Sequence, residues 1–579
     1  MKRILLVSAL IWGSITLSFA QSKLAPELNA LGPGDSAGSG SIEVIVQYKT
    51  RPTAAHQDRI WSLGGAVYAG LPLINALHAN VPNSQLPVLA NDPEVQYISP
   101  NRPLRGQLDN TAGAVLASYA WNQGLQGTGI GVAVIDSGVT LVDDLTNASS
   151  YSSWRVVGNY DTIGGGPNDQ YGHGTHVAGI IAGNATDSTC SLCDRQLRGI
   201  APNATIVNFH ALDLNGNGTD TTVIKAILQA IALKRTYNIR VMNLSLGRPV
   251  YESYRFDPLC QAVEAAWKAG IVVVVAAGND GRDNSHGTSG YGTISAPGND
   301  PYVITVGAMN AKGTPDRSDD VMTSYSSKGP TAIDHIVKPD LVAPGNRVVS
   351  LLASAGGNLA TSYPGNMVPL SYYENTTNTA LSNSYYVLSG TSMAAPVVSA
   401  AAALLLQNDP ALTPDQIKAR LMKTAYKDLP ATTTITDGGN TYVVQSDVFT
   451  VGAGYLDVQA ALSNTDLAYG RALSPKVAVD PTTGNVYFVQ NNAALWGSAA
   501  LWGSTAVWGR AALWGSTAVW GTNVFVGSQA ALWGSAALWG SAALWGSSSD
   551  TGYAALWGSA ALWGSSTADT NETMIQGED

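Results

Sequence analysis

Few cysteines, few charges and almost no long apolar runs mark this sequence. Three cysteines in 579 residues cannot build a disulfide framework, whereas a hydrophobic share of 45% is enough for a large core. Charged residues make up only 12%, about half the usual share. The formal net charge of −10 and the pI of about 5.2 argue against a nucleic-acid-binding surface. Beyond residues 1–20, no stretch is long and apolar enough to span a membrane.

The cysteines that are present leave two interpretations open. Cys190 and Cys193 could form a local disulfide in an oxidising compartment. A metal pair is the alternative, but the chain has no second Cys/His pair at zinc spacing. Cys260 precedes an amphipathic helical pattern and is expected to be buried as a small hydrophobe.

The first 105 residues divide into three segments. Residues 1–20 begin with Lys2 and Arg3, continue with an apolar run and end on small residues, which is typical of a cleaved export signal. We therefore expect a secreted, extracellular protein. Residues 21–40 are rich in Gly, Ser, Ala and Pro and are interpreted as a linker. From about residue 41 to residue 98, the patterns predict the order β-α-β-β-α-β, a ferredoxin-like α+β unit.

A serine lies at the start of an apolar helical pattern. Residues 389–396 read SGTSMAAP, and residues 397–406 are Ala, Val and Leu apart from Ser399. Ser392 would lie where unpaired N–H groups and the helix dipole favour negative charge. An acyl-transfer nucleophile needs that environment because an oxyanion develops beside it. Ser392 is therefore either a helix cap or a nucleophile.

Two other motifs decide between these interpretations. Residues 131–138 read GVAVIDSG, a buried strand that ends at Asp136, where open α/β sheets place their sites. Residues 172–179 read GHGTHVAG, in which His173 opens a small-residue helix. Ser392 can then attack a carbonyl, His173 can take its proton, and Asp136 can hold the imidazole.

Rival classes lack a residue that they need. An aspartic protease needs a second matching carboxylate motif, which does not occur. An α/β-hydrolase needs a histidine after its serine, and the last histidine is His335. A non-enzymatic, surface-binding protein on an unused enzyme scaffold would lack one of the reacting residues. Asp136, His173 and Ser392 are all present, and so is Asn279, a candidate donor to the oxyanion.

The three motifs together resemble the subtilisin-like serine proteases, whose triad has this chain order. The resemblance covers roughly residues 127–462. It implies that His173, rather than His176, is the catalytic base. It also implies a doubly wound, mostly parallel α/β sheet with helices on both faces, and a serine endopeptidase acting through an acyl-enzyme. In this position the small N-terminal unit resembles the family's inhibitory propeptide.

The resemblance extends to the groups around the scissile bond. Residues 276–279 read AAGN, and the family's Asn at this place makes Asn279 the expected oxyanion donor. A turn asparagine is the alternative. The expected substrate-binding residues have small, uncharged walls, which favour a roomy apolar pocket with broad preference. They are Ser245, Leu246, Gly247, Ala276, Ala277 and Gly278.

Two further expectations concern the rest of this region. Asp144 lies about where the family has a calcium ligand, but residues 184–198 depart from the usual pattern, and a solvated carboxylate pair (Asp143 and Asp144) is the alternative. The chemistry itself requires no cofactor. Residues 356–384 are polar and are expected to form a surface loop.

The C-terminal region repeats the unit Ala-Ala-Leu-Trp-Gly-Ser with a period of six. An even period fits strands and therefore a β-rich meander or solenoid; a low-complexity tail is the alternative. Arg510 is the only charge between Asn491 and Ser549. We expect such a tail to contact a cell surface or polymer, or to self-associate.

The sequence thus predicts a self-processed zymogen of four parts. They are a signal peptide (1–20), a propeptide acting as an intramolecular inhibitor (21–105), a peptidase domain (106–465) and a repeat region (466–579). Cleavage between the second and third parts is expected in residues 101–106. The expected substrates are polypeptides.

Overall fold

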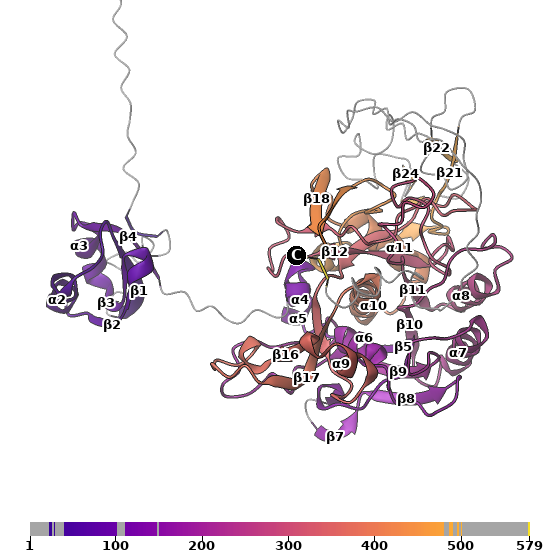
Figure 1. Ribbon diagram of the computed structural model, residues 1–579, viewed down its shortest axis with the longest axis horizontal. Helices are drawn as coiled ribbons and strands as arrows, with labels where there is room; N and C mark the ends of the chain where they lie inside the picture. Colours follow the sequence, from indigo (N-terminus) through magenta and orange to yellow (C-terminus); the bar gives the residue numbers. More distant parts are fainter. Residues whose placement is uncertain are drawn as a thin grey trace, which may run out of the picture. The chain divides into compact units, whose positions relative to one another are not determined.

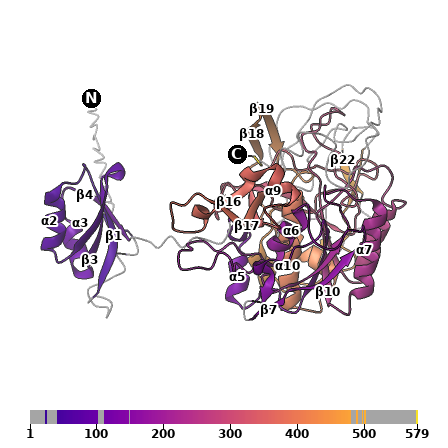
Figure 2. The same ribbon diagram turned by 60° about the horizontal axis from the view of Figure 1, so that its bottom comes forward.

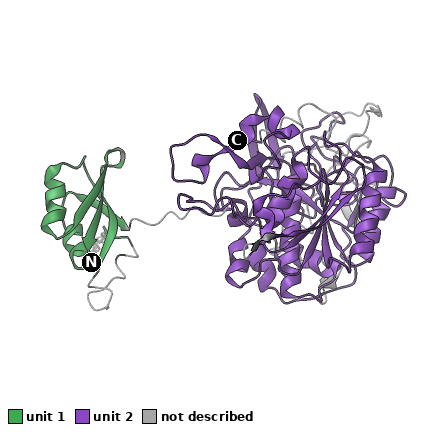
Figure 3. Cartoon of the chain, turned by 90° about the horizontal axis from the view of Figure 1, so that it is seen from below, with its two compact units in different colours: residues 1–105 green, residues 106–579 purple. Residues whose placement is uncertain are grey.

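The computed structural model describes residues 23–25, 28, 40–100, 110–147, 150–479, 486–489, 495–496, 499–500 and 577–578. The export signal, the processing junction at 101–106 and nearly all of the Trp-Gly repeats lie outside the described residues. The chain divides into two compact units, residues 1–105 and residues 106–579 (Figure 3).

The first unit is a four-stranded antiparallel sheet with two helices, in the order β-α-β-β-α-β. Its strands lie in the order β2-β3-β1-β4. Every second residue of β1, from Val44 to Tyr48, is buried, and these side chains form a core with Ile60 of α2 and Leu86 of α3. The elements are β1 (Ser41–Tyr48), α2 (Ala54–Ser62), β2 (Ala66–Leu71), β3 (Ala76–Pro82), α3 (Leu86–Ala90) and β4 (Val95–Pro100).

The chain before β1 contributes to this unit. Leu24 forms a parallel bridge with Ile98, and the Ala25 N–H donates to the Ile98 carbonyl at 2.9 Å. Ala25 and Leu28 are buried in the core. The linker interpretation is therefore wrong at these residues. The Gly- and Ser-rich composition of the segment hid three apolar side chains, Leu24, Ala25 and Leu28, that pack into this core.

The second unit is built on an eight-stranded sheet in the order β13-β12-β11-β10-β5-β9-β8, with β14 also paired to β12. Its strand pairs are parallel except β12–β13. Strands β5 and β11 are buried at every residue, as expected for strands covered on both faces. The strands are β5 (Gly131–Asp136), β8 (Val156–Asp161), β9 (Thr205–His210), β10 (Ile239–Leu244), β11 (Val272–Ala276), β12 (Ile304–Asn310), β13 (Val321–Met322) and β14 (Leu341–Pro344).

Two pairs of helices pack on this sheet. Helix α10 (Thr391–Asn408) contacts β10, β11, β12 and β14 and packs against α6 (His173–Ala182), as Figures 1 and 2 show. Helix α7 (Asp220–Leu233) packs against α8 (Pro258–Lys268). Helix α10 is long and apolar enough to cross a membrane, but 89% of it is buried inside this unit, as in the central helix of a globular core.

Two local expectations are corrected. Residues 356–384 are not a plain surface loop: α9 (Asn358–Ser362), β16 (Met367–Pro369) and the start of β17 (Leu381–Leu388) lie there, and both strands join β15 (Val348–Leu351) in an antiparallel sheet. The start of β17 lacks the apolar alternation of a strand, because Ser382 is buried while Leu381 is exposed. Cys260 is buried as expected, but it lies inside α8, because Asp257 caps the helix and the helix begins at Pro258, before the apolar pattern that follows Cys260.

The larger unit continues beyond residue 465. The Ser474 hydroxyl donates to Asp340 at 2.6 Å, and the Val477 N–H donates to the His335 carbonyl at 2.9 Å. Among the described residues, therefore, no structural boundary falls at 465/466. Two short antiparallel strands, β23 (Leu495–Trp496) and β24 (Ala499–Ala500), lie in the first and the second repeat unit. The remaining elements are α4 (Asn110–Ala114), α5 (Ala117–Asn122), β6 (Thr146–Asn147), β7 (Ser150–Trp154), α11 (Pro414–Thr424), β18 (Thr432–Asp437), β19 (Asn440–Gln445), α12 (Val458–Ser463), β20 (Ala468–Tyr469), β21 (Lys476–Val479), β22 (Val486–Val489), β23 (Leu495–Trp496) and β24 (Ala499–Ala500).

Candidate active site

A buried carboxylate and a buried imidazole meet at the end of β5. Asp136 is the last residue of β5, and His173 is the first residue of α6. The His173 Nδ1 lies 2.8 Å from the Asp136 Oδ1, and both side chains are fully buried. The Ser137 N–H donates to the same oxygen at 2.7 Å. With Nδ1 as the donor, the other ring nitrogen, Nε2, is the one able to accept a proton.

Asp169 fixes this junction, and the sequence analysis missed it. Its carboxylate accepts the Gly172 N–H at 2.7 Å and the Thr175 N–H at 2.8 Å, as an N-terminal helix cap does. It also accepts the Ser137 hydroxyl at 2.9 Å. Asp169 therefore ties the residue after Asp136 to the first turn of α6. The sequence carried only a weak signal, because Asp169 lies four residues before His173, whereas a capping residue usually stands directly before its helix.

The serine lies in the first turn of α10, four per cent exposed. Its hydroxyl donates to the Ser245 carbonyl at 3.2 Å, and the Ser245 hydroxyl donates to the Ser392 carbonyl at 2.7 Å. Asn243 donates to the Ser245 hydroxyl at 2.9 Å. Strand β10 is parallel to β5, with Asn243 opposite Val134. Asp136, the last residue of β5, and Ser245, the residue after β10, therefore lie at the same edge of the sheet. This edge lies beside β5, where the strand order reverses.

Asn279 is held against the residue before the serine. Its Oδ1 accepts the Thr391 N–H at 2.9 Å and the Thr391 hydroxyl at 3.1 Å. These two donors fix the amide orientation, so that its Nδ2 is the group left to donate. A side chain at Gly390 would reach within 3.2 Å of that Nδ2. The Gly at 390 therefore keeps open the space into which the amide donates.

His176 serves a different purpose from His173. Its Nε2 lies 3.1 Å from the carbonyl oxygens of Val348 and Tyr386, and the side chain is fully buried. Burial lowers the pKa of His176 to about 3, so the imidazole is neutral over the whole neutral and alkaline range. The structure places His173, and not His176, beside Asp136.

The two expected substrate-binding segments differ in how their main chains are used. The Ala277 N–H donates to Val306, and both main-chain groups of Gly278 are bonded to Thr391 or Ser327. In contrast, the main-chain groups of Leu246 and Gly247 make no hydrogen bond to any other described residue. The main-chain groups named for Ala277 and Gly278 are thus already bonded, and residues 276–278 can only line the candidate pocket. Residues 246–247, in contrast, have main-chain donors and acceptors that could pair with an extended peptide.

The surroundings of Asp144 do not fit a cation. Its two carboxylate oxygens accept the Asp187 N–H at 2.7 Å and the Tyr385 hydroxyl at 2.9 Å. Arg155 and the Asn184 N–H donate to its carbonyl. Burial raises the pKa of Asp144 to about 7. With donors on all three oxygens, this residue lacks the acceptor surface that calcium needs.

The two adjacent cysteines form a disulfide, Cys190–Cys193, with Cα atoms 4.9 Å apart. Glu374 lies beside them, and these three residues form the only acidic, His or Cys cluster of metal-binding size in the described part of the chain. A disulfide cannot supply thiolate ligands, so this arrangement is a crosslink.

Comparison with known proteins found chains that are similar to this one. The Subtilase family model matches residues 127–454, more than half of the chain. Serine protease AprX from Bacillus subtilis (strain 168) is 35% identical over 359 residues, covering 60% of this chain and 73% of that protein. Subtilisin E from the same organism is 30% identical over 459 residues, covering 77% and 98%. The crystal structure of a cold adapted subtilisin-like serine proteinase is 29% identical, covers 52% of this chain and 85% of that chain, and has a TM-score of 0.37.

The family model and the relatives span all three motifs, from the strand before Asp136 to the helix after Ser392. This chain belongs to the subtilase family and is a subtilisin-like serine endopeptidase, a hydrolase of peptide bonds.

Proposed function

We propose that Asp136, His173 and Ser392 form the catalytic triad and that Asn279 completes the oxyanion hole. The observation that carries this proposal is the buried 2.8 Å contact between His173 and Asp136. An imidazole held by a carboxylate at the end of β5 supports the role of His173 as the base that serves Ser392.

The proposed reaction has two halves. The Ser392 oxygen bonds to the substrate carbonyl carbon while its proton passes to the His173 Nε2. The carbonyl oxygen becomes an oxyanion, which the Asn279 Nδ2 and the Ser392 N–H stabilise. The C–N bond then breaks, the amine leaves with the proton from His173, and an acyl-enzyme remains. A water molecule, deprotonated by His173, then attacks the carbonyl carbon of that ester. The bond between this carbon and the Ser392 oxygen breaks, His173 gives the proton to the Ser392 oxygen, and the acid product leaves.

Asp136 is proposed to orient His173 throughout this cycle. Its Oδ1 lies 2.8 Å from the His173 Nδ1 and accepts the Ser137 N–H at 2.7 Å. It therefore fixes the imidazole tautomer and stabilises the imidazolium that forms between the two halves.

Substrate recognition is proposed to depend mainly on the main chain. The N–H and C=O groups of residues 246–247 would pair with an extended peptide, whatever its side chains are. The small walls at Ala276, Ala277 and Gly278 carry no charge. This supports a broad preference for apolar residues before the scissile bond.

The chain is proposed to be made as a secreted zymogen. The leader pattern in residues 1–20 supports export, and the Cys190–Cys193 disulfide is compatible with an oxidising compartment. The separate fold of residues 1–105 supports a propeptide that inhibits the enzyme until it is cut near residues 101–106. The nearly uncharged repeats support a tail that adheres to a cell surface or to other copies.

One experiment tests the catalytic proposal. Ser392→Ala should lower casein hydrolysis by on the order of 10⁶-fold, the loss known for this serine in subtilisin, and should leave residues 21–105 attached. Mass spectrometry of wild type and variant reads the junction directly. Ser382→Ala is the control, because it removes another buried hydroxyl, one that contacts Tyr373, in the same unit. If Ser392→Ala is folded and still processed or active, the triad proposal is wrong.

A further inference from the structure

The end of the chain is seated in a built site on the larger unit. Glu578 is one per cent exposed. Its carboxylate accepts the Ser324 N–H at 3.0 and 3.1 Å, the Ser324 hydroxyl, and the Arg282 Nη2 at 2.7 Å. A buried carboxylate that receives a cation and two neutral donors is strongly recognised, because charge-assisted hydrogen bonds are stronger than neutral ones.

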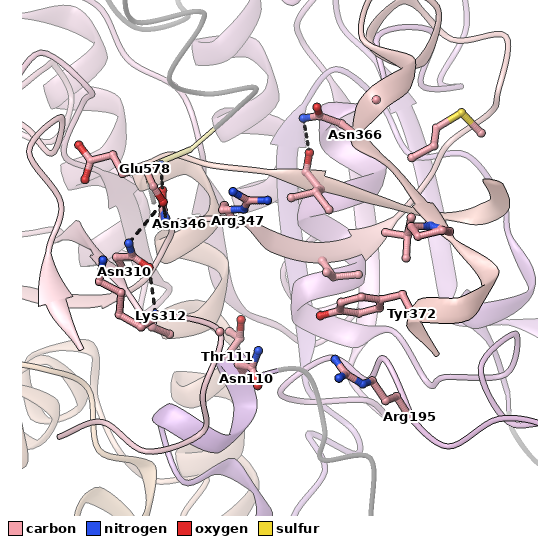
Figure 4. Close-up of a pocket in the computed structure, with 18 residues that line it drawn as sticks. Asn110, Thr111, Arg195, Asn310, Lys312, Asn346, Arg347, Asn366, Tyr372 and Glu578 are labelled. Atoms are coloured by element: carbon pink, nitrogen blue, oxygen red, sulfur yellow. Dashed lines mark hydrogen bonds between the residues drawn. The ribbon is translucent and has the colours of Figure 1, made fainter. Parts of the chain in front are cut away.

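The main chain of Glu578 is recognised as well. The Asn346 side chain accepts the Glu578 N–H at 2.8 Å and donates to its carbonyl at 2.6 Å, so one amide binds both groups of one residue. Asn310 donates to the same carbonyl at 3.4 Å. Figure 4 shows Asn310, Asn346 and Glu578 together at one side of a cavity.

The residue before Glu578 has to be glycine. Gly577 has φ of +72°, a conformation that other residues rarely adopt. A Cβ at this position would lie 2.5 Å from the Ser389 hydroxyl oxygen and 2.6 Å from the Arg347 Cγ. The site therefore selects two successive residues, Gly and Glu, rather than any acidic side chain.

The surrounding charge suits an acidic chain end. The cavity beside Glu578 has a volume of about 580 Å³, and Arg195, Lys312 and Arg347 contribute to its walls. Residues 570–579 contain three acidic residues and no basic one. Arg282 also pairs with Asp437 of β18 at 2.6 Å and lies over the Tyr442 ring, so its guanidinium is fixed in place.

We propose that Arg282, Asn310, Ser324 and Asn346, here called the clasp site, bind an acidic segment that reads Gly-Glu. The occupant is the segment Gly577-Glu578 of this chain. The repeat region is then joined to the peptidase unit at both ends, by β21 before the repeats and by Gly577 and Glu578 after them. In Figures 1 and 2 the C-terminus lies beside β18.

The clasp site adjoins the catalytic segments without touching the reacting groups. Arg282 lies three residues after Asn279, and Ser389 lies three residues before Ser392. Asn346 follows Gly345, whose carbonyl accepts the Gly390 N–H at 2.7 Å. When Glu578 occupies the clasp site, it therefore supports the two segments that carry Asn279 and Ser392, the residues of the proposed oxyanion hole.

A binding experiment tests the proposal without relying on peptidase activity. The full chain carrying Ser392→Ala is compared with the same chain lacking residues 577–579, and a fluorescent peptide of residues 570–579 is titrated into each. We expect saturable binding to the shortened chain and at least tenfold weaker binding to the full chain, whose site is filled. Glu578→Gln in the peptide should weaken binding at least tenfold, whereas Glu572→Gln, the matched control, should not. Asn346→Ala in the shortened chain should abolish binding.

Three results would overturn the proposal. They are equal binding to both chains, indifference to Glu578→Gln, and a full chain that dimerises and becomes monomeric when shortened, which would seat the segment in a second copy. If the shortened chain does not fold, the full-length variants Glu578→Gln and Glu572→Gln are compared by thermal unfolding. Only the first should lower the midpoint, by several degrees, and equal midpoints would reject the site.

Discussion

At the residue scale, the orientation of Asn279 depends on Thr391. Two donors from Thr391 hold the Asn279 Oδ1, at 2.9 and 3.1 Å, which leaves the amide nitrogen as the group able to donate. The proposed oxyanion donor, Asn279, is thus coupled to the proposed nucleophile, Ser392, through Thr391, the residue before Ser392 in α10. A donor that is already oriented costs no reorganisation when negative charge develops.

Asn279→Ala should therefore act on the chemical step. We expect kcat to fall about 10²–10³-fold, the range known for the loss of such a donor in subtilisin, with KM changed by less than about threefold. Steady-state kinetics on a peptide substrate measure both constants. Asn203→Ala, which removes a contact to Gln126, should change neither. A raised KM at unchanged kcat would assign Asn279 to substrate binding instead.

Asp144 gives the molecule a pH-dependent stability. Burial raises its pKa from 3.8 to about 7, so the folded state holds this proton more tightly than the unfolded chain. The stabilisation is complete below about pH 4 and is lost as pH rises through about 7. The lost amount is at most about 4 kcal/mol.

Asp144→Asn should remove most of this dependence. In the Ser392→Ala background, thermal midpoints between pH 5 and pH 8 should fall less for Asp144→Asn than for the parent chain. Asp143→Asn is the control, because Asp143 is exposed. Because donors already occupy the Asp144 oxygens, a chelator should not change the difference between parent and variant. A chelator effect that Asp144→Asn abolishes would restore the calcium interpretation.

At the scale of the element, the start of α6 is set by a capping residue. Asp169 accepts the N–H of Gly172, the residue before the helix, the N–H of Thr175 in its first turn, and the Ser137 hydroxyl. His173 is the first residue of this helix. Asp169 therefore fixes the position at which α6 begins, and with it the position of the His173 imidazole relative to the end of β5.

Asp169→Ala should lower both stability and activity. Three buried donors would lose their acceptor, which costs about 1–3 kcal/mol for a group left unsatisfied, and kcat should fall at least tenfold. Thermal unfolding and steady-state kinetics measure the two effects. Asp457→Ala removes the cap of α12, a helix without site residues, and should lower the midpoint while kcat is kept. Equal kcat losses in both variants would reject the positioning role.

Elements differed in how well their sequences predicted them. Helix α11 follows from local signals, because Thr413 caps it and Pro414 opens it. The strands at residues 356–384 do not, because β16 and β17 are specified by pairing with β15 and with each other rather than by apolar alternation. Local chemistry determines helix ends, whereas tertiary pairing decides short edge strands.

At the scale of the whole molecule, the first unit has its own core. Its sheet buries Val44, Val46 and Ile98 against its two helices. A unit with its own core can fold without the larger unit, which is what the proposed propeptide role requires.

Residues 21–105 should act on the peptidase when supplied separately. We expect chain 106–579, refolded alone, to regain little activity, and an added polypeptide of residues 21–105 to raise the yield at least tenfold and then to inhibit until it is digested. Active-site titration after refolding measures the yield. Val46→Asp in the added unit, which places a charge in its core, should remove the effect. Full activity without the added unit would reject the chaperone role.

The sequence by itself predicted that Asp136 ends a buried strand and that His173 and Ser392 lie where helices begin, because such element ends are specified by neighbouring residues. It also determined the β-α-β-β-α-β order of the first unit. Three sets of contacts were decided only by the tertiary structure. They are the hydrogen bond from Ser137 to Asp169, the hydrogen bonds from Thr391 to Asn279, and the binding of Glu578 by Arg282 and Asn346. These contacts join residues up to 296 positions apart, and no local pattern encodes which distant donors will meet a carboxylate once the core has closed.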